Sequence, residues 1–127
     1  MIPIKKTFET VEAGIENMLA AAECDYNNFM PENKKMCKEF ADGWDVKMGK
    51  KYIKIASKIS VWGFVVNVDN DKKFKKGDVL MSAGWRGPAR NKARGNVLEG
   101  GFEINWTGPL YMVNKGRKST TPNKIGV

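Results

Sequence analysis

Apolar residues recur at intervals of three and four in the first part of the chain, which is the pattern of an amphipathic helix. These residues are Phe8, Val11, Ile15, Met18, Leu19 and Ala22. Thr7 is a suitable N-cap, and Glu9 and Glu12 follow it in the first turns, where negative charge is favoured. The polar residues 25–28 interrupt the pattern, so we expect the helix to end there.

A second helix is expected from about Pro31 to Ala41, with Gly43 ending it. Its inward residues are Met36, Cys37 and Phe40. Each helix has one apolar stripe, so the pair must pack against the rest of the chain or against a second copy.

From Lys50 onward the period changes to two, and β-branched and aromatic residues predominate. Strands are expected at residues 52–55, 61–68, 79–81, 96–99, 102–106 and 110–113, with turns at 69–71, 75–78 and 108–109. Trp62, in the most hydrophobic strand, is assigned to the core. The predicted fold class is α+β: two N-terminal helices, then an antiparallel β-sheet of five or six strands with a short inserted helix.

The length predicts a single domain over residues 1–127. Within it, residues 1–43 form the helical pair and residues 44–113 the sheet, and residues 114–127 are expected to be a loose basic tail. A basic insert at residues 84–96, called here the arginine segment, interrupts the sheet. It contains three of the four arginines of the chain.

The arginine segment combines features that favour a phosphate and a base. Pro88 suits the first position of a short helix, and Gly95 suits the position just past its end. In such a helix Arg90 and Arg94 share a face, and Asn91 converges with Arg94.

Aromatic residues near the arginine segment favour a base-binding site. Trp85 offers a flat surface for a base, and Phe102 could form a second wall. The alternative reading is that Trp85 and Phe102 are core residues and that the charged run is a solvated face.

Charge is distributed unevenly along the chain. Residues 1–43 carry five basic and eight acidic residues, a net of −3, and residues 44–127 carry seventeen basic and six acidic, a net of +11, which together give +8. The second part therefore favours an anionic partner such as a nucleotide, a nucleic acid or an acidic protein.

The residue inventory argues against several functions. The chain has no histidine, which removes the common catalytic triads, and its two cysteines do not have zinc-site spacing. We therefore expect no catalytic residues, no metal and no cofactor. No apolar run approaches the length of a membrane span or of a signal peptide, so we expect a cytoplasmic protein with no membrane partner.

Residues 60–66, 74–80 and 88–96 resemble a family of small tailed-phage proteins, the first type of Thoeris anti-defence protein, across roughly residues 45–112. Proteins of this family are sponges that sequester cyclic ADP-ribose immune signals. The resemblance implies homodimers or assemblies of dimers in the cytoplasm of the infected bacterial host. It also implies sites near the subunit interface, and separate sites for cyclic oligonucleotides in larger assemblies.

By matching positions, the resemblance implies that Arg90, Asn91 and Arg94 contact the ligand. The expected mechanism places adenine against Trp85 or Phe102, the pyrophosphate on the two arginines, and ribose or base on Asn91. The alternative function is a basic phage protein that binds DNA or RNA or inhibits a host nucleic-acid machine. A third, a carboxylate-based hydrolase, is disfavoured because the acidic residues are scattered.

Overall fold

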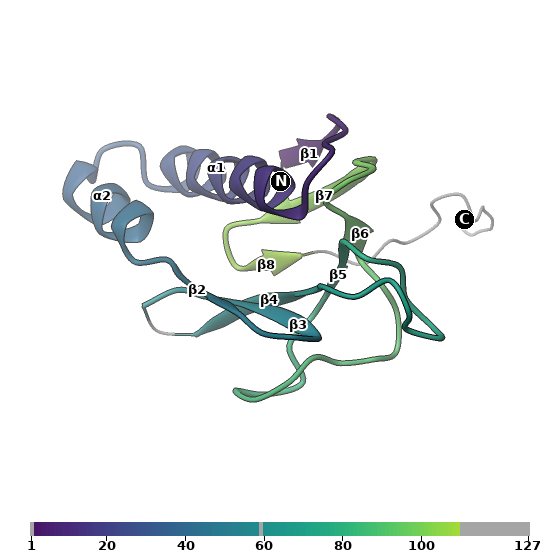
Figure 1. Cartoon of the computed structure of the whole chain (residues 1–127). Coiled ribbons are helices and arrows are strands. Elements are labelled where there is room, and N and C mark those ends of the chain that lie inside the picture. Colours follow the sequence, from purple (N-terminus) through teal and green to yellow (C-terminus); the bar gives the residue numbers. More distant parts are fainter. Residues whose placement is uncertain (1, 59, 110–127) are drawn as a thin grey trace, which may run out of the picture.

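Two helices and two antiparallel sheets make up the part of the chain that the computed structural model describes, residues 2–58 and 60–109 (Figure 1). The helices are α1 (Val11–Phe29) and α2 (Lys34–Asp42). The strands are β1 (Ile2–Ile4), β2 (Asp45–Met48), β3 (Tyr52–Ala56), β4 (Val61–Val66), β5 (Asp78–Leu80), β6 (Gly95–Asn96), β7 (Phe102–Asn105) and β8 (Gly108–Pro109). The predicted α+β class is confirmed.

The strands divide into a five-stranded sheet in the order β2-β3-β4-β5-β6 and a three-stranded sheet in the order β1-β7-β8. The predicted antiparallel sheet of five or six strands is present with five strands, and the separate three-stranded sheet was not predicted. Gly100 and Gly101 both have positive φ, which glycine adopts most readily, and Gly101 N–H bonds to the carbonyl of Ile4. This turn leads β7 away from β6 to pair with β1, a strand too short to show a period in the sequence.

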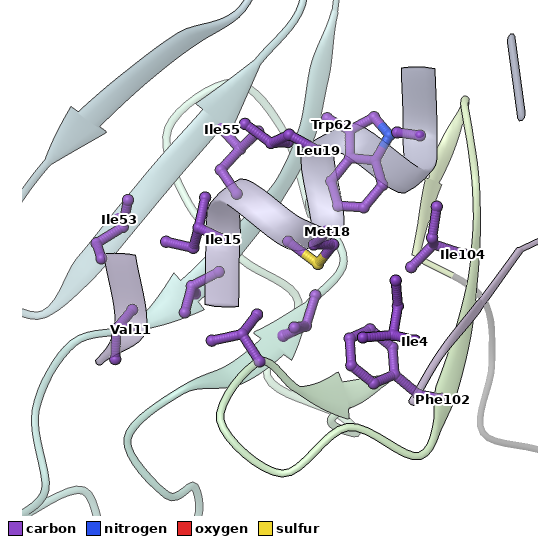
Figure 2. Close-up of a cluster of buried hydrophobic side chains, with 14 residues drawn as sticks. Ile4, Val11, Ile15, Met18, Leu19, Ile53, Ile55, Trp62, Phe102 and Ile104 are labelled. Carbon is purple, nitrogen blue, oxygen red and sulfur yellow. The ribbon is translucent and has the colours of Figure 1, made fainter. Parts of the chain in front are cut away.

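Helix α1 packs across one face of the five-stranded sheet, and the three-stranded sheet lies beside it (Figure 1). Met18, on α1, is fully buried in a cluster that includes Ile53 and Ile55 of β3 and Ile104 of β7 (Figure 2). Trp62 belongs to the same cluster, as predicted, and its indole N–H donates to the carbonyl of Trp106.

The helix bounds differ from the prediction because side-chain contacts override the local pattern. Thr10, not Thr7, caps α1, and its side chain accepts a hydrogen bond from Ala13 N–H. The helix continues through the polar residues 25–28 because Asp25 and Tyr26 are buried there, with the Asp25 carboxylate accepting the backbone N–H of Trp106.

Helix α2 begins after Asn33, whose side chain caps it, and ends at Gly43 as predicted. Met36 is 40% exposed, so its predicted inward position is wrong, whereas Phe40 packs against the core. The expected strand at residues 110–113 and the expected tail lie outside the described residues.

The arginine segment is not helical, which corrects the prediction of a short inserted helix. Its backbone instead continues the pairing of the sheet: Ala89 N–H bonds to the carbonyl of Met81, and Arg94 N–H to that of Val79. The seven residues 88–94 would form at most two helical turns, and so short a helix is unstable without tertiary support. The neighbouring strand β5 instead offers backbone groups with which these residues can form hydrogen bonds.

Gly95 lies in β6 and not past a helix end. A Cβ atom there would lie 2.1 Å from Cγ of Phe102, so Gly95→Ala should force the ring out of place. We expect a loss of about 1–3 kcal/mol in the free energy of unfolding, measured by urea denaturation. Gly87→Ala is the control, because no atom lies within 4 Å of its Cβ position. Equal stability of the two variants would contradict this packing.

Candidate functional site

The arginine segment covers the face of the five-stranded sheet that α1 leaves open. In Figure 1 the green connection between β5 and β6 runs on the opposite side of β3 and β4 from α1. A second, smaller core lies beneath it, formed by Phe64, Val66, Phe74 and Leu80, with Ala93 of the arginine segment packed against them. The segment is thus held in place from below. Its polar residues Arg86, Arg90, Asn91 and Lys92 are exposed, whereas Arg94 and Asn96 are buried.

Trp85 is the most exposed large apolar residue of the described chain, with 62% of its surface accessible. The ammonium group of Lys54, on β3, lies 4.0 Å from the centroid of the indole ring. This is a cation–π contact, which contributes about 0.5–1 kcal/mol at an exposed site. The core alternative for Trp85 is therefore wrong, and the indole is available at the surface.

Arg90 is fixed by a fork of hydrogen bonds. Its two terminal nitrogens donate to the two carboxylate oxygens of Asp71 at 3.0 Å, and one of them also donates to the Tyr52 hydroxyl. The Asp71 carboxylate also accepts the backbone N–H groups of Lys73 and Phe74. The hydrogen bond from Arg90 is the main reason that the pKa of Asp71 lies well below its usual range, and that of Arg90 is raised in turn by Asp71 and Tyr52.

A shallow depression of about 480 Å³ adjoins this pair, and we call it the cationic groove. Its lining residues are Lys50, Lys51, Val68, Asn70, Asp71, Lys72 and Arg90. Asp71 compensates the charge of Arg90, and Lys51 Nζ lies 3.6 Å from the same carboxylate. The uncompensated positive charge of the groove therefore comes mainly from lysines.

The structure brings Trp85 and Arg90 to one face, because each contacts a residue of β3. Lys54 lies over Trp85, and Tyr52 accepts from Arg90. Tyr52 and Lys54 alternate with the buried Ile53, so they lie on the same face of the strand, about 7 Å apart. Together these four residues form what we call the strand-face site.

Two of the predicted ligand residues lie elsewhere. Arg94 is 1% exposed, and its Nε donates to the carbonyl of Lys92, so it shares no face with Arg90. Phe102 is 3% exposed and packs in the α1 core beside Ile4 (Figure 2), so it forms no second wall for a base. The prediction for Arg94 assumed a helix at residues 88–94, which the structure does not have. The prediction for Phe102 assumed that its ring is open to a ligand beside the arginine segment, whereas the ring is buried.

Asn91 is exposed next to Arg90, and its side-chain oxygen accepts the N–H of Lys92. Sequence reasoning missed Tyr52, Lys54 and Asp71. The alternation of residues 52–55 was the available signal, because it places Tyr52 and Lys54 opposite the core isoleucines. The pairing of Asp71 with Arg90 joins residues far apart in the chain and has no local signal.

Comparison with known proteins finds no matching family model, no significantly similar curated protein and no similar solved structure.

Within residues 2–58 and 60–109, no group of three or more acidic or cysteine side chains is placed to hold a metal ion. Both cysteines are free thiols. Neither helix of the described chain has the length and apolar character that crossing a membrane requires.

The Arg90–Asp71 pair should make stability depend on pH. The pKa of Asp71 in the folded protein is below its ordinary value of 3.8, so the pair stabilises the fold at neutral pH. This contribution should decline as the pH falls below about 4 and disappear below the folded-state pKa. Asp71→Asn should therefore lower the urea midpoint at pH 7, and its difference from the wild type should shrink in acid.

Asp69→Asn is the matched control, because Asp69 is exposed in the same loop and makes no ion pair with another residue of the described chain. Its urea midpoint should follow that of the wild type at every pH. Identical behaviour of the two variants would show that the pair does not stabilise the loop.

Proposed function

We propose that this protein binds a nucleotide-class ligand at the strand-face site and the cationic groove and holds it without chemical conversion. The observation that carries the proposal is the exposed indole of Trp85, which lies on the same sheet face as a cluster of cationic side chains. In line with the family that the sequence resembles, the proposed ligand is a cyclic ADP-ribose-type immune signal.

The base of the ligand would stack on Trp85 after Lys54 moves aside. Base–aromatic stacking contributes about 1–3 kcal/mol, more than the cation–π contact that it replaces. The displaced ammonium of Lys54 is then free to contact a phosphate. Replacing the cation–π contact by base stacking therefore costs little free energy, and it keeps the positive charge of Lys54 beside the ligand.

The phosphates would lie toward the cationic groove. The separation of about 7 Å between Tyr52 and Lys54 is comparable to the reach from base to phosphate within one nucleotide. Lys50 and Lys72 supply charge there, and Asp71 fixes the guanidinium of Arg90 so that it lines the groove. Asn91, which is exposed beside Arg90, would bond ribose or base. Arg94 and Phe102 have no contact role in this proposal.

The absence of histidine from the chain supports a holding function, since the usual general base near neutral pH is missing. As part of the same proposal, the protein acts in the cytoplasm of the infected bacterial host as a homodimer or an assembly of dimers. Sedimentation velocity tests the oligomeric part directly.

A second candidate function, binding of single-stranded nucleic acid, is favoured by the spread of the positive charge. Lys50, Lys51 and Lys72 line the groove, and Arg86 and Lys92 are exposed in the arginine segment. These cations are more than one pyrophosphate requires. Polymer binding should weaken steeply with salt, with a slope set by several phosphates, whereas a single nucleotide should show a shallow slope.

The proposal is tested by mixing the protein with cyclic ADP-ribose isomers, cyclic oligonucleotides and a short single-stranded DNA. Free ligand is quantified by mass spectrometry before and after heating. We expect one small nucleotide to be depleted and then returned with unchanged mass. Trp85→Ala should weaken its affinity between about fivefold and a hundredfold by calorimetry, because a stacking surface is lost.

Phe29→Ala is the matched control, since Phe29 is equally exposed but lies at the far end of α1. It should bind the nucleotide as the wild type does. If heating returned a ligand of altered mass, the protein would have converted it chemically and would be an enzyme. Retention of the DNA alone would favour the second candidate, and equal binding by Trp85→Ala and the wild type would reject the site.

A further inference from the structure

A second cavity of the described chain lies away from the arginine segment. It has a volume of about 580 Å³ and opens where the end of α1, the start of α2 and the turn after β7 meet. We call it the aromatic pocket. Its apolar lining consists of Tyr26, Phe29, Met30, Met36, Phe40 and Trp106.

The rings of the aromatic pocket are arranged in two directions. Tyr26 and Phe40 stack at 4.4 Å with their planes 9° apart, and Trp106 stands edge-on to both. Phe29 lies 5.2 Å from Trp106 at a tilt of 31°. A flat ring entering the pocket therefore meets both ring faces and ring edges, the two geometries that aromatic pairs prefer.

The walls of the pocket are anchored before any ligand arrives. The backbone of Trp106 donates to the buried Asp25 and accepts from the indole of Trp62. Phe40 packs edge-on against Trp44, whose indole N–H donates to Glu23. A preformed cavity of this volume is typical of small-molecule sites, and it is larger than one anchoring side chain of a protein partner would fill.

The polar groups at the pocket are few and carry no net charge. Ser57, Ser60 and Thr107 contribute hydroxyls, and Glu39 and Lys58 contribute one charge of each sign. The cationic groove, in contrast, has four cationic side chains and one carboxylate in its lining. The two sites therefore suit ligands of different charge.

We propose that the aromatic pocket binds an uncharged, planar aromatic compound of naphthalene size or larger, with a hydrogen-bonding group at one edge. The apolar rings of the pocket contact the flat surface of the compound, and the serine hydroxyls form hydrogen bonds with its polar edge. This site is separate from the proposed nucleotide site and does not depend on it.

Fluorescence titration with the uncharged dye N-phenylnaphthylamine tests this proposal, because its emission rises in an apolar site. We expect one saturable site per chain. Phe29→Ala should weaken binding roughly fivefold or more through the lost ring contact. Met36→Lys should also weaken it, by placing a charge in the pocket. Both side chains are substantially exposed, so these variants should fold, which circular dichroism verifies.

Trp85→Ala is the control and should bind the dye as the wild type does. Several results would overturn the proposal: no saturable binding, binding unchanged in both pocket variants, or binding lost in Trp85→Ala alone. Tighter binding of the anionic analogue anilinonaphthalene sulfonate to the same pocket would contradict the uncharged class. A stoichiometry that falls as protein concentration rises would mean that a second copy covers the pocket, and would equally reject a ligand site.

Discussion

The burial of strand β4 on both faces is the constraint on which the rest of the structure depends. Trp62 and Val65 pack into the core beneath α1, while Phe64 and Val66 pack into the smaller core on the other side. A strand that is apolar on both faces needs a cover on each. Helix α1 provides one cover, and the loop after β4 together with the arginine segment provides the other.

This constraint explains how the arginine segment is arranged on the sheet. Ala93 of the arginine segment packs against the core of Phe64, Val66 and Leu80, and the backbone of Ala89 and Arg94 bonds to Met81 and to Val79 of β5. The charged side chains of the segment are then spread along the sheet and not gathered on one helix turn. The Arg90–Asp71 pair joins the arginine segment to the loop after β4, which gives Arg90 a structural role whether or not it binds a ligand.

The sequence predicted the helices and strands better than the tertiary contacts between them. Residues 52–55 show strand alternation, residues 61–66 form a run rich in β-branched and aromatic residues that is typical of a buried strand, and the stripe of residues 8–22 shows a helix, because local sequence patterns determine these elements. The continuation of α1 to Phe29 depends on Tyr26 stacking on Phe40 and on Asp25 accepting from Trp106, contacts between distant segments. At the site, the exposure of Trp85 agrees with the functional reading. Arg94 and Phe102 are buried by tertiary packing, which the spacing of residues in the sequence does not predict.

The contact between Lys54 and Trp85 has a consequence for the protein without a ligand. A bare indole at the surface of a sheet is an adhesive patch that favours non-specific association. With an ammonium group over its face, the ring presents a charge to an approaching chain on that side. The same lysine thus makes non-specific association through this face of the indole less favourable while no ligand is bound.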